Sequence, residues 1–227
     1  RAKACMKSAI LRSFQGGPGP VAGNADRRSQ EIFEVSLPRL LREIRDCRVC
    51  APYLPFGPRP VLSVVASARL LLISQAPGSK VHQSGIPWSD ASGDRLRDWM
   101  GIDASVFYDK TKIAIMPMGF CYPGAAENGG DNPPRPECAP LWHTRLRAHW
   151  PQIGLTLLVG SYSIDYYLPD TRRPTMTATV AAWREYLPRY LPLPHPSWRT
   201  TAWEHKNPWF AAELLPEVRK KVGALIR

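Results

Sequence analysis

The sequence predicts an α/β fold: a three-layer α/β/α sandwich with a central, mainly parallel, four-stranded sheet. Short, continuously apolar runs indicate strands that are buried on both faces of a sheet. Segments with apolar residues at helical spacing alternate with these runs, which is typical of parallel β-α-β units. Loops rich in Pro and Gly follow the runs, and functional loops of such sheets lie beyond the carboxyl ends of the strands.

Four apolar runs are the expected strands, at residues 69–73, 112–116, 155–159 and 190–193. Turn-forming residues end the first three runs: Gln75-Ala76-Pro77-Gly78 follows the first, a Pro/Gly-rich stretch the second and Gly160 the third. Three loops therefore qualify as functional, at residues 75–88, 117–138 and 195–210.

Helices are expected at residues 29–50, 94–100, 141–150, 175–186 and 208–226. Pro38 should break or restart the first helix, and Pro216 should divide the last one into two pieces. Ser92 or Asp90 is the expected N-cap of the second helix.

The chain divides into a flexible N-terminal lead-in at residues 1–28, marked by Gly16-Gly17-Pro18-Gly19-Pro20, and a single domain at residues 29–227. No apolar run approaches the roughly 20 residues that a membrane helix needs. Residues 1–30 lack the apolar core of a clear secretory signal. We therefore expect an intracellular, cytoplasmic protein whose cysteines are reduced or metal-bound rather than in disulfides.

The chain is basic, with 30 Lys and Arg against 19 Asp and Glu and a formal net charge of +11. A surplus of this size suits a polyanionic partner such as nucleic acid. A merely basic surface explains the charge equally well, since the basic residues are spread along the chain.

Four of the five cysteines form two spaced pairs. Cys47 and Cys50 make a Cys-x2-Cys pair, and a Pro/Gly-rich loop separates Cys121 from Cys138. Four thiolates from two segments can hold zinc or a [4Fe–4S] cluster, and the number of ligands does not distinguish the two. The alternative is four unrelated buried thiols. Cys5 lies in the lead-in and is a spare.

Two segments at strand ends resemble the motifs of the uracil-DNA glycosylase superfamily. Ser74-Gln75-Ala76-Pro77-Gly78 with the later Gly85-Ile86-Pro87-Trp88 resembles its first active-site motif, which in the iron–sulfur class reads Gly-Glu-Ala-Pro-Gly and then Gly-x-Pro-Phe. His195-Pro196-Ser197 resembles the second motif, His-Pro-Ser. The four spaced cysteines also match the arrangement in that class, so the resemblance covers roughly residues 45–210.

The resemblance implies a DNA-repair glycosylase that flips uracil out of DNA into a pocket, hydrolyses its N-glycosidic bond and leaves an abasic site. The implied substrate-binding residues are Gln75, Ala76, Pro77 and Gly78, which form the pocket wall, and Trp88, which stacks on the base. His195 matches the catalytic histidine, a donor to uracil O2 as negative charge forms there. The alternatives are a tryptophan of the core and a histidine that only stabilises a turn.

The resemblance assigns the DNA contact to three residues. Ser197 matches the residue that grips the phosphates beside the lesion, while Trp198 or Arg199 fills the gap left by the flipped base. The superfamily usually has a different residue pair at these last two positions.

Two expected pocket groups are missing from the sequence. The carboxylate that positions water in other classes aligns with Ala76, and the Asn that reads the uracil edge is absent after the second strand. His82 is therefore the candidate for orienting water or the sugar, with a surface-loop histidine as the alternative. Backbone groups, Asp131 or Asn132 are the candidates for reading the base.

The resemblance further implies a [4Fe–4S] cluster on Cys47, Cys50, Cys121 and Cys138, with zinc as the less favoured metal. We expect a monomer, associated with the nucleoid by its function, that acts on uracil-containing DNA. No lysine is placed for Schiff-base chemistry, so the enzyme should be monofunctional. The rival interpretation is a non-catalytic, metal-containing module that binds nucleic acid.

Overall fold

Four parallel strands form one sheet in a computed structural model that describes residues 35–127 and 129–227. The strand order is β2-β1-β3-β4. The strands are β1 (Leu70–Ile73), β2 (Ile113–Ile115), β3 (Leu155–Val159) and β4 (Tyr190–Leu193). The predicted four-stranded sheet is confirmed, and every neighbouring pair is parallel. The lead-in at residues 1–28 and the start of the first expected helix lie outside the described residues.

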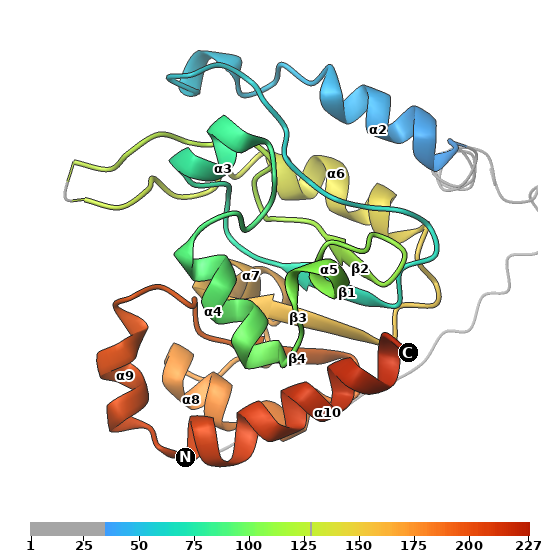
Figure 1. The fold of residues 1–227 in the computed structure, drawn as a ribbon. Coiled ribbons are helices and arrows are strands. Elements are labelled where there is room, and N and C mark those ends of the chain that lie inside the picture. The colour runs from blue at the N-terminus through green and yellow to red at the C-terminus, as the bar shows by residue number, and fades with distance from the viewer. Residues whose placement is uncertain (1–34, 128) are drawn as a thin grey trace, which may run out of the picture. The chain divides into compact units, whose positions relative to one another are not determined.

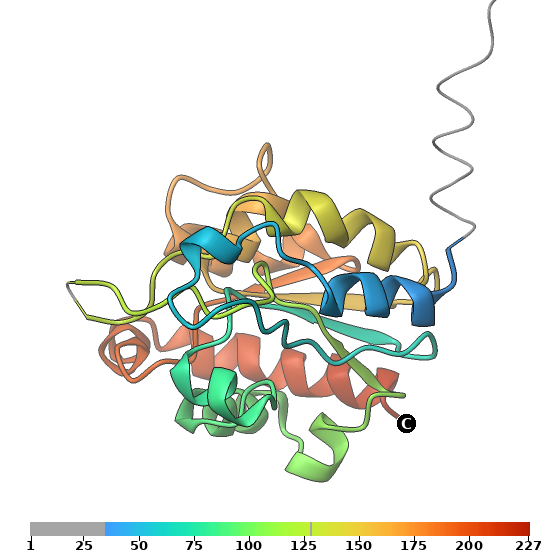
Figure 2. The same cartoon turned by 90° about the horizontal axis from the view of Figure 1, so that it is seen from above.

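Helices cover both faces of the sheet, so the predicted three layers are confirmed (Figures 1 and 2). Helices α6 and α2 pack together on one face, and α10 and α4 pack together on the other. The α-helices are α2 (Leu37–Arg45), α3 (Ser79–Ser84), α4 (Ala91–Met100), α5 (Ala104–Phe107), α6 (Cys138–Arg147), α7 (Ser161–Tyr167), α8 (Met176–Ala181), α9 (Thr200–Lys206) and α10 (Leu215–Leu225). Shorter helical turns are η1 (Ala51–Tyr53), η2 (Trp183–Tyr186) and η3 (Phe210–Leu214).

The prolines act at helix starts. Pro38 occupies the first turn of α2, where a missing N–H costs nothing, so the described helix begins there. Pro216 lies in the first turn of α10, directly after the π-helical turn η3, and the backbone stays helical through this junction. The predicted division of the last helix into two pieces is therefore wrong: a change from π- to α-helical geometry accommodates the proline without a break. Asp90 is the N-cap of α4, and its Oδ1 accepts a hydrogen bond from Gly93 N at 2.9 Å.

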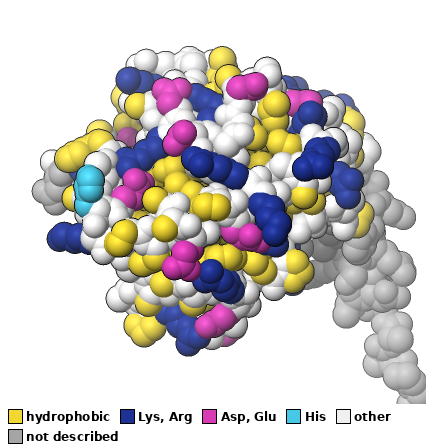
Figure 3. Space-filling view, turned by 60° about the horizontal axis from the view of Figure 1, so that its bottom comes forward, with side chains coloured by type: hydrophobic (Ala, Val, Ile, Leu, Met, Phe, Trp, Pro, Cys, Tyr) yellow, Lys and Arg dark blue, Asp and Glu magenta, His cyan; other side chains and the backbone are white. Residues whose placement is uncertain are grey.

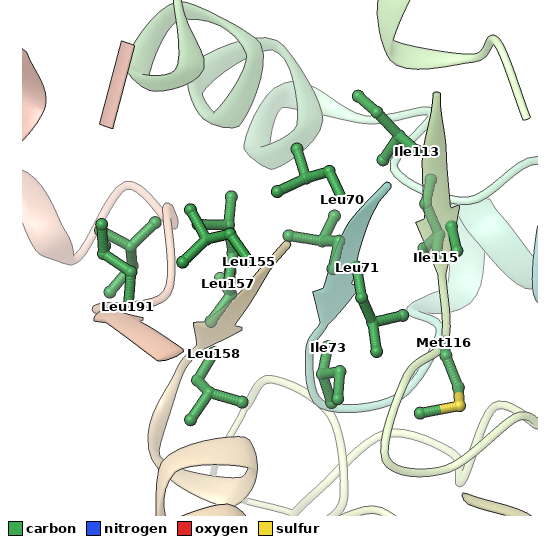
Figure 4. Close-up of a cluster of buried hydrophobic side chains, with 14 of the residues drawn as sticks. Leu70, Leu71, Ile73, Ile113, Ile115, Met116, Leu155, Leu157, Leu158 and Leu191 are labelled. Carbon is green, nitrogen blue, oxygen red and sulfur yellow. The ribbon is translucent and has the colours of Figure 1, made fainter. Parts of the chain in front are cut away.

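The sheet lies inside a continuous apolar core. The ten side chains labelled in Figure 4 are all buried, and they come from both faces of the strands: Leu70, Leu71, Ile73, Ile113, Ile115, Met116, Leu155, Leu157, Leu158 and Leu191. Burial on both faces explains why the strand sequences are continuously apolar. None of the described helices is long and apolar enough to cross a membrane.

The turn before α4 holds Trp88 in the left-handed backbone region, with φ 59°. This conformation is uncommon for a bulky residue, so surrounding contacts must maintain it. The Trp88 carbonyl accepts hydrogen bonds from Tyr108 Oη at 3.1 Å and from Arg97 Nη1 at 3.3 Å. Gly93 packs directly against this carbonyl, and a Cβ atom added there would lie 1.9 Å from the Trp88 oxygen.

We expect Gly93→Ala to lower the free energy of unfolding by roughly 1–3 kcal/mol, because the added methyl group must displace the Trp88 backbone. Gly223→Ala is the matched control: it lies inside α10, and its added Cβ would meet nothing within 4 Å. That substitution should raise the free energy of unfolding by roughly 0.5–1 kcal/mol through helix propensity. Chemical denaturation measures both values, and effects of the same sign would contradict the close approach at Gly93.

Candidate active site

A cavity of about 460 Å³ opens beyond the carboxyl ends of the strands. It brings together nine residues that the sequence singled out: Gln75, Ala76, Pro77, Gly78, Trp88, His195, Ser197, Trp198 and Arg199. They come from two loops that are more than a hundred positions apart in the sequence. The parallel sheet makes them neighbours.

One wall of the cavity is the loop that follows β1. Backbone hydrogen bonds continue past the strand ends, from Met118 N to Ser74 O at 2.7 Å and from Gly119 N to Gln75 O at 3.1 Å. These bonds fix the loop after β1 against the loop after β2. The wall is therefore made of positioned backbone rather than of mobile side chains.

Trp88 and His195 stack against each other in the cavity, with ring centroids 5.6 Å apart and an interplanar angle of 27°. The backbone of His195 is fixed through its carbonyl oxygen, which accepts hydrogen bonds from Ser197 N at 2.8 Å and from Thr200 Oγ1. Gly160 lies beside it with φ +90°, and a Cβ atom there would meet the His195 Cβ at 3.5 Å, an ordinary contact, so the backbone conformation rather than space favours glycine.

The electrostatic surroundings favour a neutral His195. Burial lowers the pKa of His195 below its ordinary value, and the charge of Asp90 opposes that shift. A neutral imidazole donates from only one nitrogen, so His195 can offer one N–H group to a ligand near pH 7.

Asp90 also lines the cavity, a placement that its sequence context did not reveal. The sequence identified Asp90 only as a candidate helix cap. That role is correct, but one carboxylate can both cap α4 and face the cavity, because its two oxygens together have about four lone-pair sites.

A hairpin between Gly124 and Asn132 contributes the far wall and projects from the body of the fold (Figure 1). Asp131 lines the cavity and packs on Gly78, where an added Cβ would lie 3.2 Å from Asp131 Oδ2. Burial and the charge of Asp90 raise the pKa of Asp131, while a hydrogen bond from Tyr122 lowers it.

Asn132 has a different position. Its Nδ2 donates to the carbonyl oxygens of Ala125 at 3.1 Å and of Pro123 at 3.3 Å. These bonds hold the hairpin together and occupy the amide, and Asn132 is not among the lining residues. Of the two candidates for reading a base, only Asp131 lies at the cavity.

His82 does not line the cavity. It lies on α3, where its ring contacts those of Phe56 and Tyr122 at centroid distances of 5.8 Å. Its Nδ1 is buried without a hydrogen-bond partner among the described residues. Burial and the charge of Arg59 lower the pKa of His82. The predicted role in orienting water or sugar therefore has no geometric support.

The rim of the cavity exposes an aromatic ring and a cation. Trp198 is 79% exposed, and the Arg199 guanidinium lies 5.5 Å from the centre of its ring. Arg95 of α4 fixes this segment: its Nη1 donates to Ser197 O at 2.9 Å, and its Nη2 lies 2.8 Å from a Glu204 carboxylate oxygen of α9. Basic and acidic side chains are interspersed over the face shown in Figure 3.

The four spaced cysteines line a second, smaller cavity. Cys47 and Cys50 follow α2, Cys121 lies in the loop after β2, and Cys138 begins α6. Burial raises the pKa of Cys138 to about 12 and that of Cys121 to about 11. The backbone N–H of Phe120 donates to Cys138 Sγ at 3.3 Å. In the part of the chain that the structure describes, no group of three or more Cys, His, Asp or Glu side chains could hold a single metal ion.

Comparison with protein families matches residues 63–219 to the uracil DNA glycosylase superfamily. The matched range contains the whole sheet, both loops with predicted motifs and every residue that lines the larger cavity except Val61. It begins after Cys47 and Cys50. The chain belongs to the uracil DNA glycosylase superfamily, a membership that indicates a DNA glycosylase, a hydrolase of N-glycosidic bonds.

Proposed function

We propose that the protein removes uracil from DNA by hydrolysis and leaves an abasic site. The observation that carries this proposal is the stacked pair of Trp88 and His195 inside one cavity, against the backbone wall after β1. An aromatic face and a fixed N–H donor are what a flipped pyrimidine needs for binding and departure. A module that only gripped DNA phosphates would need neither group.

His195 acts on the leaving group. When the N-glycosidic bond breaks, its electron pair goes to uracil and negative charge develops on O2. The neutral imidazole donates its N–H to this oxygen and stabilises the charge through this hydrogen bond. Trp88 and the wall from Gln75 to Gly78 hold the ring in place meanwhile.

Asp90 replaces the carboxylate that is missing at Ala76. A water molecule must attack the sugar carbon as uracil leaves, and it must lose a proton in doing so. Asp90 lies in the cavity with His195, and an oxygen that is not used for capping α4 can orient this water and accept its proton. No lysine is found among the described residues that line the cavity, so a single hydrolytic step is favoured over Schiff-base chemistry.

Asp131 stands in for the missing Asn. It is the one of the two sequence candidates that lines the cavity, and a neutral carboxyl group offers one donor and one acceptor, as an amide does. Burial and the charge of Asp90 shift the pKa of Asp131 toward this form, while the hydrogen bond from Tyr122 opposes the shift. At the rim, Ser197 contacts phosphate, and Trp198 or Arg199 fills the space of the flipped base. The enzyme acts as a monomer.

Cys47, Cys50, Cys121 and Cys138 hold a [4Fe–4S] cluster rather than zinc. The four thiols line one cavity, and an all-thiolate ligand set is the usual one for such clusters. The cluster would tie the end of α2 to the loop after β2 and to the start of α6. Its role is structural, since these thiols line a cavity separate from that of His195.

The direct test of this function is uracil release. The purified protein should convert a uracil-containing oligonucleotide into one that carries an abasic site, while the matched thymine oligonucleotide stays intact. Tight binding of the uracil strand without release would favour the non-catalytic module instead.

We expect His195→Ala to lower the single-turnover cleavage rate by on the order of 10²–10³-fold while binding to uracil DNA changes little, because the lost donor acts mainly in the transition state. Trp88→Ala should weaken binding as well as rate, since it removes the stacking surface. His205→Ala, at an exposed position on α9, is the control. If the His195→Ala enzyme cleaves at nearly the wild-type rate, His195 has no catalytic role and only stabilises a turn.

We expect Asp90→Asn to lower the rate by on the order of 10²–10⁴-fold, since an amide cannot accept the proton of water. Asn is as good an N-cap as Asp, so the free energy of unfolding should change little. Asp103→Asn is the matched control because Asp103 caps α5 in the same way, accepting from Val106 N at 2.9 Å, outside the cavity. Equal rates for the two variants would remove Asp90 from the mechanism.

We expect iron and inorganic sulfide in the purified protein, with a broad absorption near roughly 400 nm. Cys121→Ser and Cys138→Ser should each lose most of the iron, because each removes one thiolate ligand. Cys5→Ser, in the lead-in, is the control and should keep the iron. One zinc per chain with no iron would show that the cysteines bind zinc and that the cluster proposal is wrong.

A further inference from the structure

A separate cavity of about 360 Å³ lies away from the proposed active site. Its floor includes Leu71 of β1 and Thr156 of β3, and its walls include Thr144 and Arg147 of α6, Trp150 and Arg189. Arg189 directly precedes β4, and Thr156 is the second residue of β3. This cavity therefore lies toward the amino ends of the strands, whereas the larger cavity lies beyond their carboxyl ends.

Two arginines of this cavity contact one tyrosine, Tyr190. Arg147 Nη2 lies 3.5 Å from the Tyr190 hydroxyl oxygen, and the Arg189 guanidinium lies 5.2 Å from the centre of the Tyr190 ring. The Arg147 guanidinium also lies 5.2 Å from the centre of the Tyr167 ring. Two tyrosine side chains restrict Arg147, and one of them, Tyr190, also contacts Arg189.

No acid offsets these charges within residues 35–127 and 129–227, where neither guanidinium has a carboxylate oxygen within 4.0 Å. Arg145, two residues earlier on α6, is paired with Glu43. A cation at the end of α6 is favoured by the helix dipole, which accounts for Arg147 alone. It does not account for a second arginine, Arg189, that lines the same cavity and contacts the same tyrosine, because like charges repel.

We propose that this cavity binds a phosphate group. Two guanidinium groups offer paired N–H donors that match phosphate oxygens, and Thr144 and Thr156, which carry hydroxyl donors, also line the cavity. The backbone holds the site in shape, since Thr156 N donates to Arg189 O at 3.0 Å. A bound phosphate would offset the repulsion of the two cations.

The phosphate group has two chemical sources, a free phosphate ion and a phosphodiester of the DNA backbone. Both present the same oxygens to Arg147 and Arg189, and the net charge of +11 attracts both. The inference does not rest on the proposed uracil specificity, because none of the lining residues belongs to the catalytic cavity.

Amide chemical shifts of the isotope-labelled protein, followed during a titration with inorganic phosphate, test this site. Saturable shifts should centre on Thr156, Arg189 and Tyr190, with a dissociation constant on the order of 1 mM. A second titration with a lesion-free oligothymidylate distinguishes the sources. Shifts of the same amides by the oligonucleotide assign the site to the DNA backbone, and phosphate-only shifts assign it to a free ion.

The double variant Arg147→Gln/Arg189→Gln should lose about tenfold in phosphate affinity, since two charge-assisted contacts are removed. Arg172→Gln/Arg184→Gln is the matched control: it removes the same charge from two arginines that are paired with Asp165 and Glu213. Equal affinities of the two double variants would overturn the proposal. The proposal would also be overturned if phosphate caused no shifts in the wild-type protein, or shifts centred on other residues. This result does not depend on how well any variant folds. Uracil release by the first double variant should equal that of wild type, so the two proposals can fail separately.

Discussion

Parallel pairing of the strands is the constraint on which the candidate active site depends. Every strand of a parallel sheet ends at the same edge, so the segments that follow β1, β2 and β4 are delivered to one place. The pairing even extends beyond the strands, through the bonds of Ser74 and Gln75 with the loop after β2 and through Gly160 N and Leu193 O at 2.9 Å. An antiparallel partner would have sent one of these loops to the opposite end. The apolar strand sequences thus serve the site, because burial on both faces fixes the edge from which the polar loops emerge.

Helix α4 positions several residues of the cavity. Its N-cap Asp90 lines the cavity, Gly93 closes on the Trp88 carbonyl, and Arg95 holds the backbone of Ser197. The N-cap and the first turns of one short helix therefore supply a cavity side chain, the close contact with Trp88 and the support of Ser197. This arrangement explains the left-handed backbone of Trp88: the hydrogen bonds to its carbonyl and the absence of a side chain at Gly93 stabilise a conformation that the residue rarely adopts by itself.

The strands and most helices could be predicted because their patterns are local, whereas the site needed tertiary information. Strands β3 and β4 coincide with the apolar runs, and β1 and β2 differ by one residue at their ends. Helices α3 and α9 were expected as loops, since six or seven residues are too few for a helix to be stable without its tertiary contacts. His82 was misplaced for the same reason. A helix turns successive side chains by about 100°, so Val81 lines the cavity while His82 faces Phe56 and Tyr122. Asp90 was identified only as a cap, because nothing local shows that it faces His195.

The segment from Pro117 to Cys121 belongs to both the active-site cavity and the cysteine cavity, so the two cannot be positioned independently. Pro117 lines the first cavity and Cys121 the second. Between them, Phe120 stacks on the buried ring of His143, with centroids 5.7 Å apart.

His143 Nε2 lies 3.1 Å from Pro117 O, and since a carbonyl only accepts, this nitrogen must carry the proton. Its Nδ1 then accepts from the Tyr167 hydroxyl at 2.7 Å. Burial lowers the pKa of His143 to about 4, so the ring stays neutral and this bonding pattern persists across the physiological range. The loop after β2 is thereby held by α6 and α7 at Pro117, and farther along Phe120 N donates to Cys138 Sγ at 3.3 Å. This part of the active-site wall is therefore bound to the rest of the fold rather than a free loop.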